Sequence, residues 1–436
     1  MYYLKFIYLT ATTLIFSMTS VNSETFNDAL TKAYLLNPTL AASRAQLRSK
    51  EEKISEAWGG WYPTIEFSLD AGKNWKHVSG NAVSSANRNK NLTPKNSDFV
   101  FSQNIYQGGK TSAALKVARA EILAQRARLL ATEQDVLFGA GRAYVDVVRD
   151  EAVLKLNRNN EAVLLRQLEA TRDRFEVGEV TRTDVAQAKA RHSGSIAESV
   201  ESNGQLSNSR ASYRNIIGDF PGVLKKVKPL LDIPTSQSAV KDLARELSPG
   251  VLVARYEEKT AAAKVEETFS GLLPSVDIEG RLSRSDALSA VDSRTDNAKI
   301  FAKLTIPLYQ SGIVRSRLRA AKQIHAQKKM ELNASLRRSD EKSAQAWENL
   351  LTANAQISAL TAEITAATTA LEGVKQEAKV GSRTVLDVLD AEQELLDARV
   401  NLVRAERNKV VASMELHRAI GNLTAKGLNL DVNFFD

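Results

Sequence analysis

The sequence contains no cysteine. Disulfide bonds, thiolate catalysis, zinc sites built on cysteine, iron–sulfur clusters and a lipidated N-terminal cysteine are therefore all excluded. Proline and glycine are scarce, with 9 and 21 residues among 436, and aromatic residues make up only 6% of the chain. Alanine, leucine, glutamate, arginine and lysine are the residues that fill helices, so their abundance here favours long helices.

No charge of one sign dominates the sequence. Lysine and arginine total 59 against 51 aspartates and glutamates, so the formal net charge is only +8. This modest surplus is typical of solvated surface and does not indicate nucleic-acid binding. Apolar residues make up 43% of the chain, which is enough to bury a large core and excludes a disordered chain.

Patterns that carry chemistry are also missing. No nucleophile lies beside a base in a recognisable arrangement, and the histidines are isolated, without the spacing of paired metal ligands. We therefore expect no cofactor, no metal and no enzyme activity. The histidines are His77, His192, His325 and His417.

The one long apolar run lies at the N-terminus. Lys5 precedes an apolar run from Phe6 to Met18, and small residues up to Ser23 suit cleavage. The run is shorter than the ~20 residues of a spanning helix, so we expect a secretory signal peptide at residues 1–23, with an uncleaved anchor as the alternative. No later stretch is apolar for ~18 residues, so a membrane location of the mature chain would need a β-barrel.

The chain repeats itself once. Five pairs of landmarks occur in the same order in both halves, first 211 and then 203 residues apart. A fixed order at nearly fixed spacing is evidence for a duplicated unit. The pairs are Asn37-Pro38 with Ser248-Pro249, Tyr62-Pro63 with Leu273-Pro274, Tyr106-Gln107-Gly108-Gly109 with Tyr309-Gln310-Ser311-Gly312, Val177-Gly178 with Val380-Gly381, and Ile217-Gly218 with Ile420-Gly421.

Each half is expected to contain a helix, a β-hairpin, a long helix, a tip turn and a last helix. Helical spacing covers about Thr25–Trp58 and about Val240–Phe269, and a proline-free stretch from Lys110 to Phe175 predicts a helix ~100 Å long. Apolar–polar alternation indicates hairpins at about 64–105 and 275–308, with long polar connections such as His77–Asn96. The resulting division is a first repeat at 24–218 with its tip at Gly178, a linker at 219–239, a second repeat at 240–421 with its tip at Gly381, and a C-terminal segment at 422–436.

The predicted strands have one apolar and one polar face. In Thr64–Ala71, isoleucine, phenylalanine and leucine alternate with glutamate, serine and aspartate. This is the pattern of a transmembrane barrel, but four strands cannot close one, so several copies would each donate four. The alternative is a small soluble four-stranded sheet covered by helices. In a barrel the long loops face outward, which would place the helices on the periplasmic side.

The duplicated helix–hairpin–helix plan, Tyr-Gln-Gly-Gly at 106–109 and Val-Gly-Ser-Arg-Thr-Val-Leu-Asp-Val-Leu-Asp at 380–390 resemble TolC-type outer-membrane efflux proteins, along essentially the whole mature chain. The resemblance implies a mainly α fold class with a transmembrane β-barrel portion. It implies a homotrimer whose twelve-stranded barrel in the outer membrane continues as a long α-helical coiled-coil barrel in the periplasm. The segments 219–239 and 422–436 would form an irregular equatorial domain.

The same resemblance implies an exit duct without catalysis. Its partners would be a periplasmic adaptor (membrane fusion) protein, an inner-membrane efflux pump or ABC secretion transporter, and outer-membrane lipid. The pump would choose the cargo, which would be drugs, toxic compounds or proteins. The alternative from another functional class is a periplasmic structural coiled coil or adaptor protein that bridges envelope layers.

The resemblance further implies a gate at the periplasmic entrance. Thr183, Asp184 and Arg383 match residues whose contacts between neighbouring coils hold the entrance closed. Asp387 and Asp390 match the aspartates that ring it. In a trimer these two would give six carboxylates at one constriction, which is how cation-selective pores are lined.

The tips also have a purely structural interpretation. Gly178 and Gly381 fit helix C-terminal positions that need positive φ. An aspartate in the first turn of the following helix complements the helix dipole, which accounts for Asp184 and Asp387 without a gate. One departure from the family is Ala378, where the best-known member has a tyrosine, so one closing hydrogen bond cannot form. The candidate N-caps are Thr181 or Thr183 and Ser382 or Thr384.

Overall fold

The computed structural model describes residues 24–432 except 78–88, 231–233, 235 and 289–291. The predicted signal peptide at 1–23 lies outside the described residues. The helices are α1 Phe26–Leu36, α2 Pro38–Trp58, η1 Gly59–Trp61, α4 Lys110–Glu176, α5 Arg182–Ile217, α6 Gln237–Leu247, α7 Pro249–Ser270, α8 Ile313–Lys379 and α9 Val385–Ala419, and the strands are β1 Thr64–Ala71, β2 Asn74–His77, β3 Asn89–Leu92, β4 Lys95–Gln107, β5 Ser275–Asp286 and β6 Arg294–Thr305.

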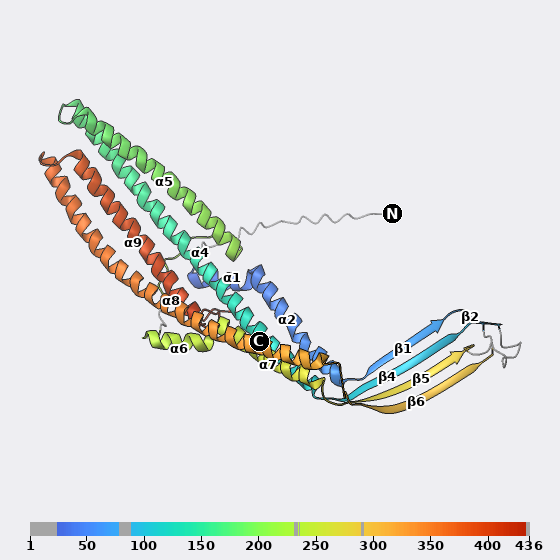
Figure 1. Ribbon diagram of the computed structural model, residues 1–436. Helices are drawn as coiled ribbons and strands as arrows, with labels where there is room; N and C mark the ends of the chain where they lie inside the picture. The colour runs from blue at the N-terminus through green and yellow to red at the C-terminus, as the bar shows by residue number, and fades with distance from the viewer. Residues whose placement is uncertain (1–23, 78–88, 231–233, 235, 289–291, 433–436) are drawn as a thin grey trace, which may run out of the picture.

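The molecule is elongated, with a helical body between a β-sheet at one end and two helical tips at the other (Figure 1). The long helices α4 and α8 have 67 residues each, so each is ~100 Å long. They begin at Lys110 and Ile313, 203 positions apart, which is the repeat spacing seen in the sequence. Within the described part of the chain, no helix combines the length and apolar character needed to cross a membrane.

The first helix of each repeat is broken, whereas the spacing predicted one continuous helix. Asn37 ends α1 and caps α2, because its side chain accepts hydrogen bonds from the N–H groups of Thr39 and Leu40. Pro38 then occupies the first position of α2, where its missing N–H costs nothing. Ser248 and Pro249 divide α6 from α7 in the second repeat. The prediction of a single helix was therefore wrong in both repeats.

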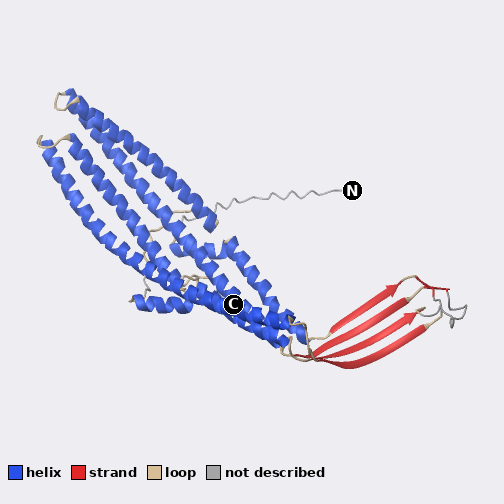
Figure 2. Ribbon diagram, viewed as in Figure 1, coloured by secondary structure: helices blue, strands red, loops and turns tan. Residues whose placement is uncertain are grey.

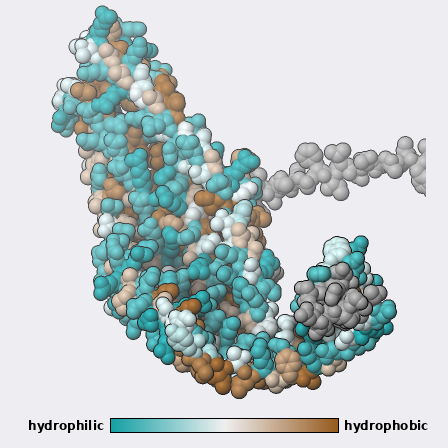
Figure 3. Space-filling view, turned by 45° about the vertical axis from the view of Figure 1, so that its right-hand side comes forward, coloured by the Kyte–Doolittle hydropathy of each residue, from teal (hydrophilic) through white to brown (hydrophobic). Residues whose placement is uncertain are grey.

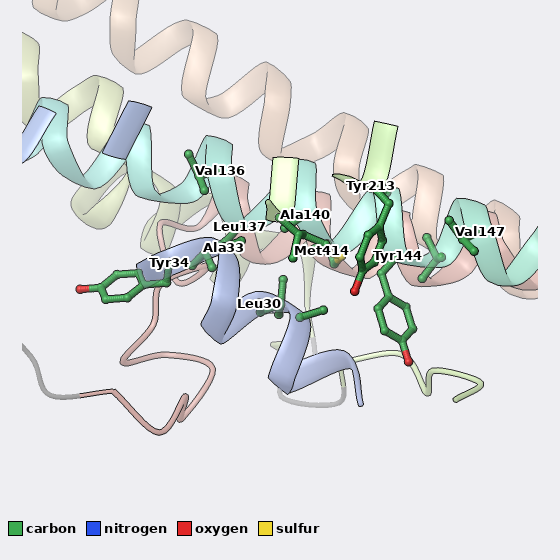
Figure 4. Close-up of a cluster of buried hydrophobic side chains, with 14 of the residues drawn as sticks. Leu30, Ala33, Tyr34, Val136, Leu137, Ala140, Tyr144, Val147, Tyr213 and Met414 are labelled. Carbon is green, nitrogen blue, oxygen red and sulfur yellow. The ribbon is translucent and has the colours of Figure 1, made fainter. Parts of the chain in front are cut away.

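The largest core lies where α1 crosses the middle of α4 (Figure 4). Tyr144 is fully buried there, and its hydroxyl lies 2.9 Å from the carbonyl oxygens of both Glu24 and Lys225. Burial raises the pKa of this phenol to about 12, so the hydroxyl stays protonated. Its neighbours in this core include Leu30 and Ala33 of α1, Leu137 and Ala140 of α4, Tyr213 of α5 and Met414 of α9.

The strands form a four-stranded antiparallel sheet in the order β1-β4-β5-β6, separated from the helices at one end of the molecule (Figure 2). β1 spans the residues for which the alternation predicts a strand. β2 and β3 form a second, two-stranded sheet. They lie partly inside His77–Asn96, which was predicted as a polar connection, so the expectation of only four strands per chain was incomplete. Both strands consist mostly of polar residues, so apolar–polar alternation does not reveal them.

Helices do not cover the sheet. Ile65 in β1 is 62% exposed and Ile300 in β6 is 76% exposed, although both lie on the apolar face. The alternative of a sheet buried under helices is therefore wrong for the described chain. Figure 3 shows hydrophobic residues gathered at the bend between the sheet and the helical body. In the connection to α8, Leu308 and Tyr309 are almost fully exposed.

Candidate functional site

The candidate site is the pair of turns at the end of the molecule remote from the sheet (Figure 1). Gly178 has φ of 80° and Gly381 has φ of 78°, a left-handed conformation that glycine adopts without strain. The Glu179 N–H donates to the carbonyl of Arg174 at 2.9 Å, and the Ser382 N–H donates to that of Glu377 at 2.9 Å. These bonds end both long helices in the same way.

Each turn leads into a capping box that starts the next helix. The Thr181 N–H donates to Asp184 Oδ2 at 2.8 Å, and the Thr384 N–H donates to Asp387 Oδ2 at 2.8 Å. Thr181 and Thr384 are therefore the N-caps, rather than Thr183 or Ser382. Thr183 is exposed in the first turn of α5, and within the described chain its hydroxyl makes no hydrogen bond.

An ion pair closes each turn, with the charges in opposite order. In the first tip, Arg174 Nε lies 3.0 Å from Glu179 Oε2, so the arginine comes first. In the second tip, Arg383 Nε lies 2.9 Å from Glu377 Oε2, so the glutamate comes first. The Glu377 carboxylate raises the pKa of Arg383. Arg383 is thus engaged within its own turn.

Asp387 carries a perturbed carboxyl group. Hydrogen bonds from the backbone and side chain of Thr384 hold its pKa below its usual value near 3.8, and the Arg383 guanidinium acts in the same direction. The carboxylate is therefore ionised at any physiological pH. This carboxylate also belongs to the capping box that starts α9, so the structural interpretation of Asp387 applies whether or not it lines a gate.

One ion pair of the site joins the two repeats. Arg191 Nη2 of α5 lies 2.5 Å from Asp390 Oδ1 of α9, and both side chains are about half exposed. In addition, Leu164 of α4 forms a buried apolar cluster with Val385 and Leu389 of α9. The two tips of one chain are thus held together by a salt bridge and an apolar contact.

Sequence reasoning missed Arg191 and Glu377. Glu377 could have been found, because it lies six residues before Arg383, across a glycine turn that brings the two flanking segments together. Arg191 carries no such signal, because its partner Asp390 is 199 residues away. The sequence-predicted residues divide accordingly: Asp184, Asp387 and Arg383 contact their own turns, and Asp390 contacts the other repeat.

Comparison with known proteins matches both repeats. A family model described as outer membrane efflux protein matches residues 29–219 and 240–422. The outer membrane efflux protein BepC of Brucella suis biovar 1 is 32% identical over 411 residues, covering 94% of this chain and 88% of its own. The outer membrane protein TolC of Vibrio cholerae serotype O1 is 30% identical over 416 residues, covering 91% and 90%.

The fold agrees with a solved structure. The CmeC outer membrane channel of Campylobacter jejuni superposes with a TM-score of 0.81 at 14% identity, covering 91% of this chain and 85% of that chain. These relatives are outer membrane proteins, which argues against the alternative of a bridging coiled coil or adaptor. With both repeats matched along nearly the whole described chain, this protein belongs to the outer membrane efflux protein family and is a channel protein of the outer membrane, not an enzyme.

Proposed function

We propose that three copies of this chain assemble into one export duct. Each copy contributes its four-stranded sheet to a twelve-stranded barrel in the outer membrane, and the helical bodies continue as a tunnel through the periplasm. The observation that carries the proposal is the sheet itself. Among the described residues, strands β1 and β6 each have a strand partner on one side only, and no helix covers the apolar face. Open edges are not tolerated in lipid, and closure with neighbouring copies removes them.

The two tips form the gate of this duct. Their turns contain Gly178 and Gly381, the contacts that hold the entrance closed involve Thr183, Asp184 and Arg383, and Asp387 and Asp390 ring the opening. The ion pair between Arg191 and Asp390 supports a further closing contact in this gate, because it joins the two coils of one chain. Opening separates these coils.

The duct is coupled to a periplasmic adaptor and an inner-membrane pump or secretion transporter, which select the cargo. Residues 1–23 are removed as a signal peptide. The linker at 219–239, between the two repeats, and the segment at 422–436, after the second repeat, form the equatorial domain. The packing of Leu423 and Ala425 into the main core supports this place for the C-terminal segment.

Cysteine crosslinking tests the assembly, because the chain has no cysteine of its own. Ser68 in β1 and Asn297 in β6 lie in one row of the sheet, three strand spacings apart. That is ~14 Å, too far for a disulfide within one chain. Oxidised outer membranes carrying Ser68→Cys with Asn297→Cys, or with Thr295→Cys or Lys299→Cys to sample the register, should give a reducible ladder that ends at trimer.

The matched control is Ser68→Cys with Ser283→Cys. Ser283 lies in the same row on β5, which is not an edge strand. This pair should give no ladder. A ladder that ends at dimer for every edge pair would contradict the trimer, since eight strands would then close the barrel.

A further inference from the structure

The apolar face of the sheet changes character abruptly at its distal end, the end remote from the helices. Phe67, Phe99, Leu282 and Ala298 lie side by side across the four strands and form one apolar row. Two residues further along β5 and β6, ~7 Å away, charge begins with Arg284 and Asp296, whereas β1 and β4 have Leu69 and Ser97 in this row. Five charged residues on this same face form what we call the charged rim: Lys95, Arg284, Asp286, Arg294 and Asp296.

The charged rim carries one more cation than anions. Arg284 Nε lies 2.6 Å from Asp296 Oδ1, and Arg294 Nε lies 3.5 Å from Asp286 Oδ1. All four side chains are about half exposed. Lys95 is exposed beside Asp286 in the register, and in the described part of the chain it has no ion pair. The charged rim therefore presents two half-exposed arginines, each held by an aspartate, and one exposed ammonium group.

The opposite end of the same face has no such charge. There Tyr106 lies beside Val276 and is 48% exposed, and its repeat counterpart Tyr309 is 87% exposed. Trp61 and Tyr62 are exposed next to the start of β1. Aromatic side chains of this kind anchor a protein at a membrane interface without selecting a headgroup charge. The two membrane boundaries of the face therefore differ in chemistry.

Two hollows lie on this face where the apolar row meets the charged rim. One, of about 470 Å³, is lined by Phe67, Phe99 and Leu282 and by the ion pair of Arg284 with Asp296. The other, of about 310 Å³, is lined by Leu69, Lys95, Arg284 and Asp286, and by Asp70 from the opposite face. Each hollow thus has an apolar wall on the side of the membrane interior and charged side chains on the distal side, and the second hollow adds the cation Lys95. This shape and polarity suit an amphiphile that is anionic at its outer end.

We propose that the charged rim binds the phosphate groups of a phosphorylated lipid in the outer leaflet, with its acyl chains against Phe67, Phe99 and Leu282. The proposal rests on the proposed function, which places this face of the sheet in lipid with its distal end outward. A guanidinium group has five N–H donors, so Arg284, which uses two nitrogens on Asp296, and Arg294 keep donors for phosphate oxygens, and Lys95 adds an ammonium group. The paired aspartates hold both arginines in place. A cationic rim in only one leaflet would fix the depth of the barrel and its orientation.

Native mass spectrometry of the detergent-purified assembly tests the proposal. The probes are diphosphoryl lipid A, the same lipid with both phosphates removed, and inorganic phosphate. Diphosphoryl lipid A should bind at least tenfold more tightly than the dephosphorylated lipid, and inorganic phosphate at the same concentration should not displace it. Lys95→Gln with Arg284→Gln should remove most of this preference.

Arg281→Gln is the matched control, because Arg281 lies on β5 on the opposite, polar face, 3.2 Å from Asp98. It should leave lipid binding unchanged. Equal binding of the two lipids, or displacement by inorganic phosphate, would overturn the proposal. The crosslinked ladder of the edge cysteines, measured on the same sample, separates the two claims: an intact ladder without phosphate preference refutes only the lipid site.

Discussion

The two long helices are equal in length but have different surroundings. α4 and α8 contain 67 residues each, yet 25 residues of α4 are buried against only 7 of α8. α4 packs against α1, α2, α5, α7 and α9, whereas α8 packs against α6, α7 and α9. The two copies of the duplicated unit therefore differ: α4 is central within the chain, whereas α8 lies at its edge.

The difference shows which helices of the chain expose apolar side chains that have no partner within the described residues. Ile324, Met330 and Leu351 of α8 are about half exposed, and Val200 of α5 is 68% exposed. These side chains lie on the helices that bound the chain on either side, just as β1 and β6 bound the sheet. In the proposed trimer both edges meet neighbouring copies. The central helix should then govern the stability of the chain, and the edge helix should govern assembly.

The largest expected effect tests the central helix. Leu137 of α4 is fully buried in the main core. Leu137→Ala removes its side chain from a packed site and should lower the free energy of unfolding by ~2–5 kcal/mol. Urea unfolding in detergent, followed by tryptophan fluorescence, measures this change.

The matched variant on the edge helix is Leu351→Ala in α8, where the side chain is 48% exposed. In an isolated chain its cost should stay within ~0.5 kcal/mol. A cost above ~1 kcal/mol in the assembled protein would place Leu351 against a neighbouring copy. The comparison of the two helices breaks down if Leu137→Ala costs no more than Leu351→Ala.

Much of this architecture could be predicted from the sequence, because it depends on local periodicity. The alternation in Thr64–Ala71 gives β1, and the proline-free stretch after Lys110 gives α4. The positive φ of Gly178 and Gly381 follows from their place after long helical stretches. The break at Pro38 was visible as a landmark but was not used as a helix boundary.

The rest depends on contacts between distant parts of the chain. Arg191 and Asp390 are 199 positions apart, and their separate helices give no sign that they meet. Nor does helical spacing in the sequence distinguish α4 from α8, since burial depends on how many helices surround each one. The roles of the tip residues in a gate stay a prediction, because a gate exists only between several coils.

The second prediction concerns the ring, where the repeats differ in sequence. Asp387 and Asp390 of the second tip correspond to Asp184 and Gln187 of the first, so only the second tip carries two carboxylates. Two carboxylates of this ring ~8 Å apart would repel one another by roughly 2 kcal/mol at an effective dielectric of 20. This repulsion favours a bound cation once opening separates Asp390 from Arg191. Replacing both by alanine should abolish block by La³⁺ in planar bilayers and lower cation selectivity.

Gln187→Ala is the control from the first tip and should leave the block unchanged. Because the folded pKa of Asp387 is depressed, its charge persists to pH values below its usual pKa near 3.8. Its contribution to stability is present above that usual value and is lost only as the pH falls through the folded pKa. Block should therefore persist at pH 5. Identical reversal potentials in the double variant and the parent would mean that these aspartates have only a structural role at the tip and do not set the ion selectivity.

The third prediction asks which contacts hold the tips closed. Arg191→Ala removes the bond between the repeats, whereas Arg383→Ala and Asp184→Ala loosen the second and first turns. Each should raise the single-channel conductance, on the order of a few-fold. Arg191→Ala should act most strongly, because an exposed pair that crosses two coils resists their separation directly. Unchanged conductance in all three variants would mean that other residues close the tunnel.

The smallest effect concerns an anchor that only the first repeat has. Glu133 of α4 accepts a hydrogen bond from the Ala425 N–H at 2.7 Å and so fastens the C-terminal segment, whereas the equivalent residue of α8 is Leu336. Burial raises the pKa of Glu133, against the opposing effects of this hydrogen bond and of Arg44. The charged form is thus disfavoured by folding. The contribution of Glu133 to stability should therefore be fully present below its unfolded-state pKa and be lost as the pH rises through the folded pKa.

Glu133→Gln should keep the acceptor oxygen and remove this pH dependence. At pH 7 its free energy of unfolding should equal that of the parent or exceed it by less than ~1 kcal/mol, because the amide loses no hydrogen bond and needs no charge in a half-buried site. Glu133→Leu copies the second repeat and leaves the Ala425 N–H without a partner, which should cost ~1–3 kcal/mol. Urea midpoints at pH 5 and pH 7 separate these effects. If glutamine destabilises the protein as much as leucine does at pH 7, then the charge of Glu133 itself holds the C-terminal segment, and the anchor is electrostatic rather than a hydrogen bond.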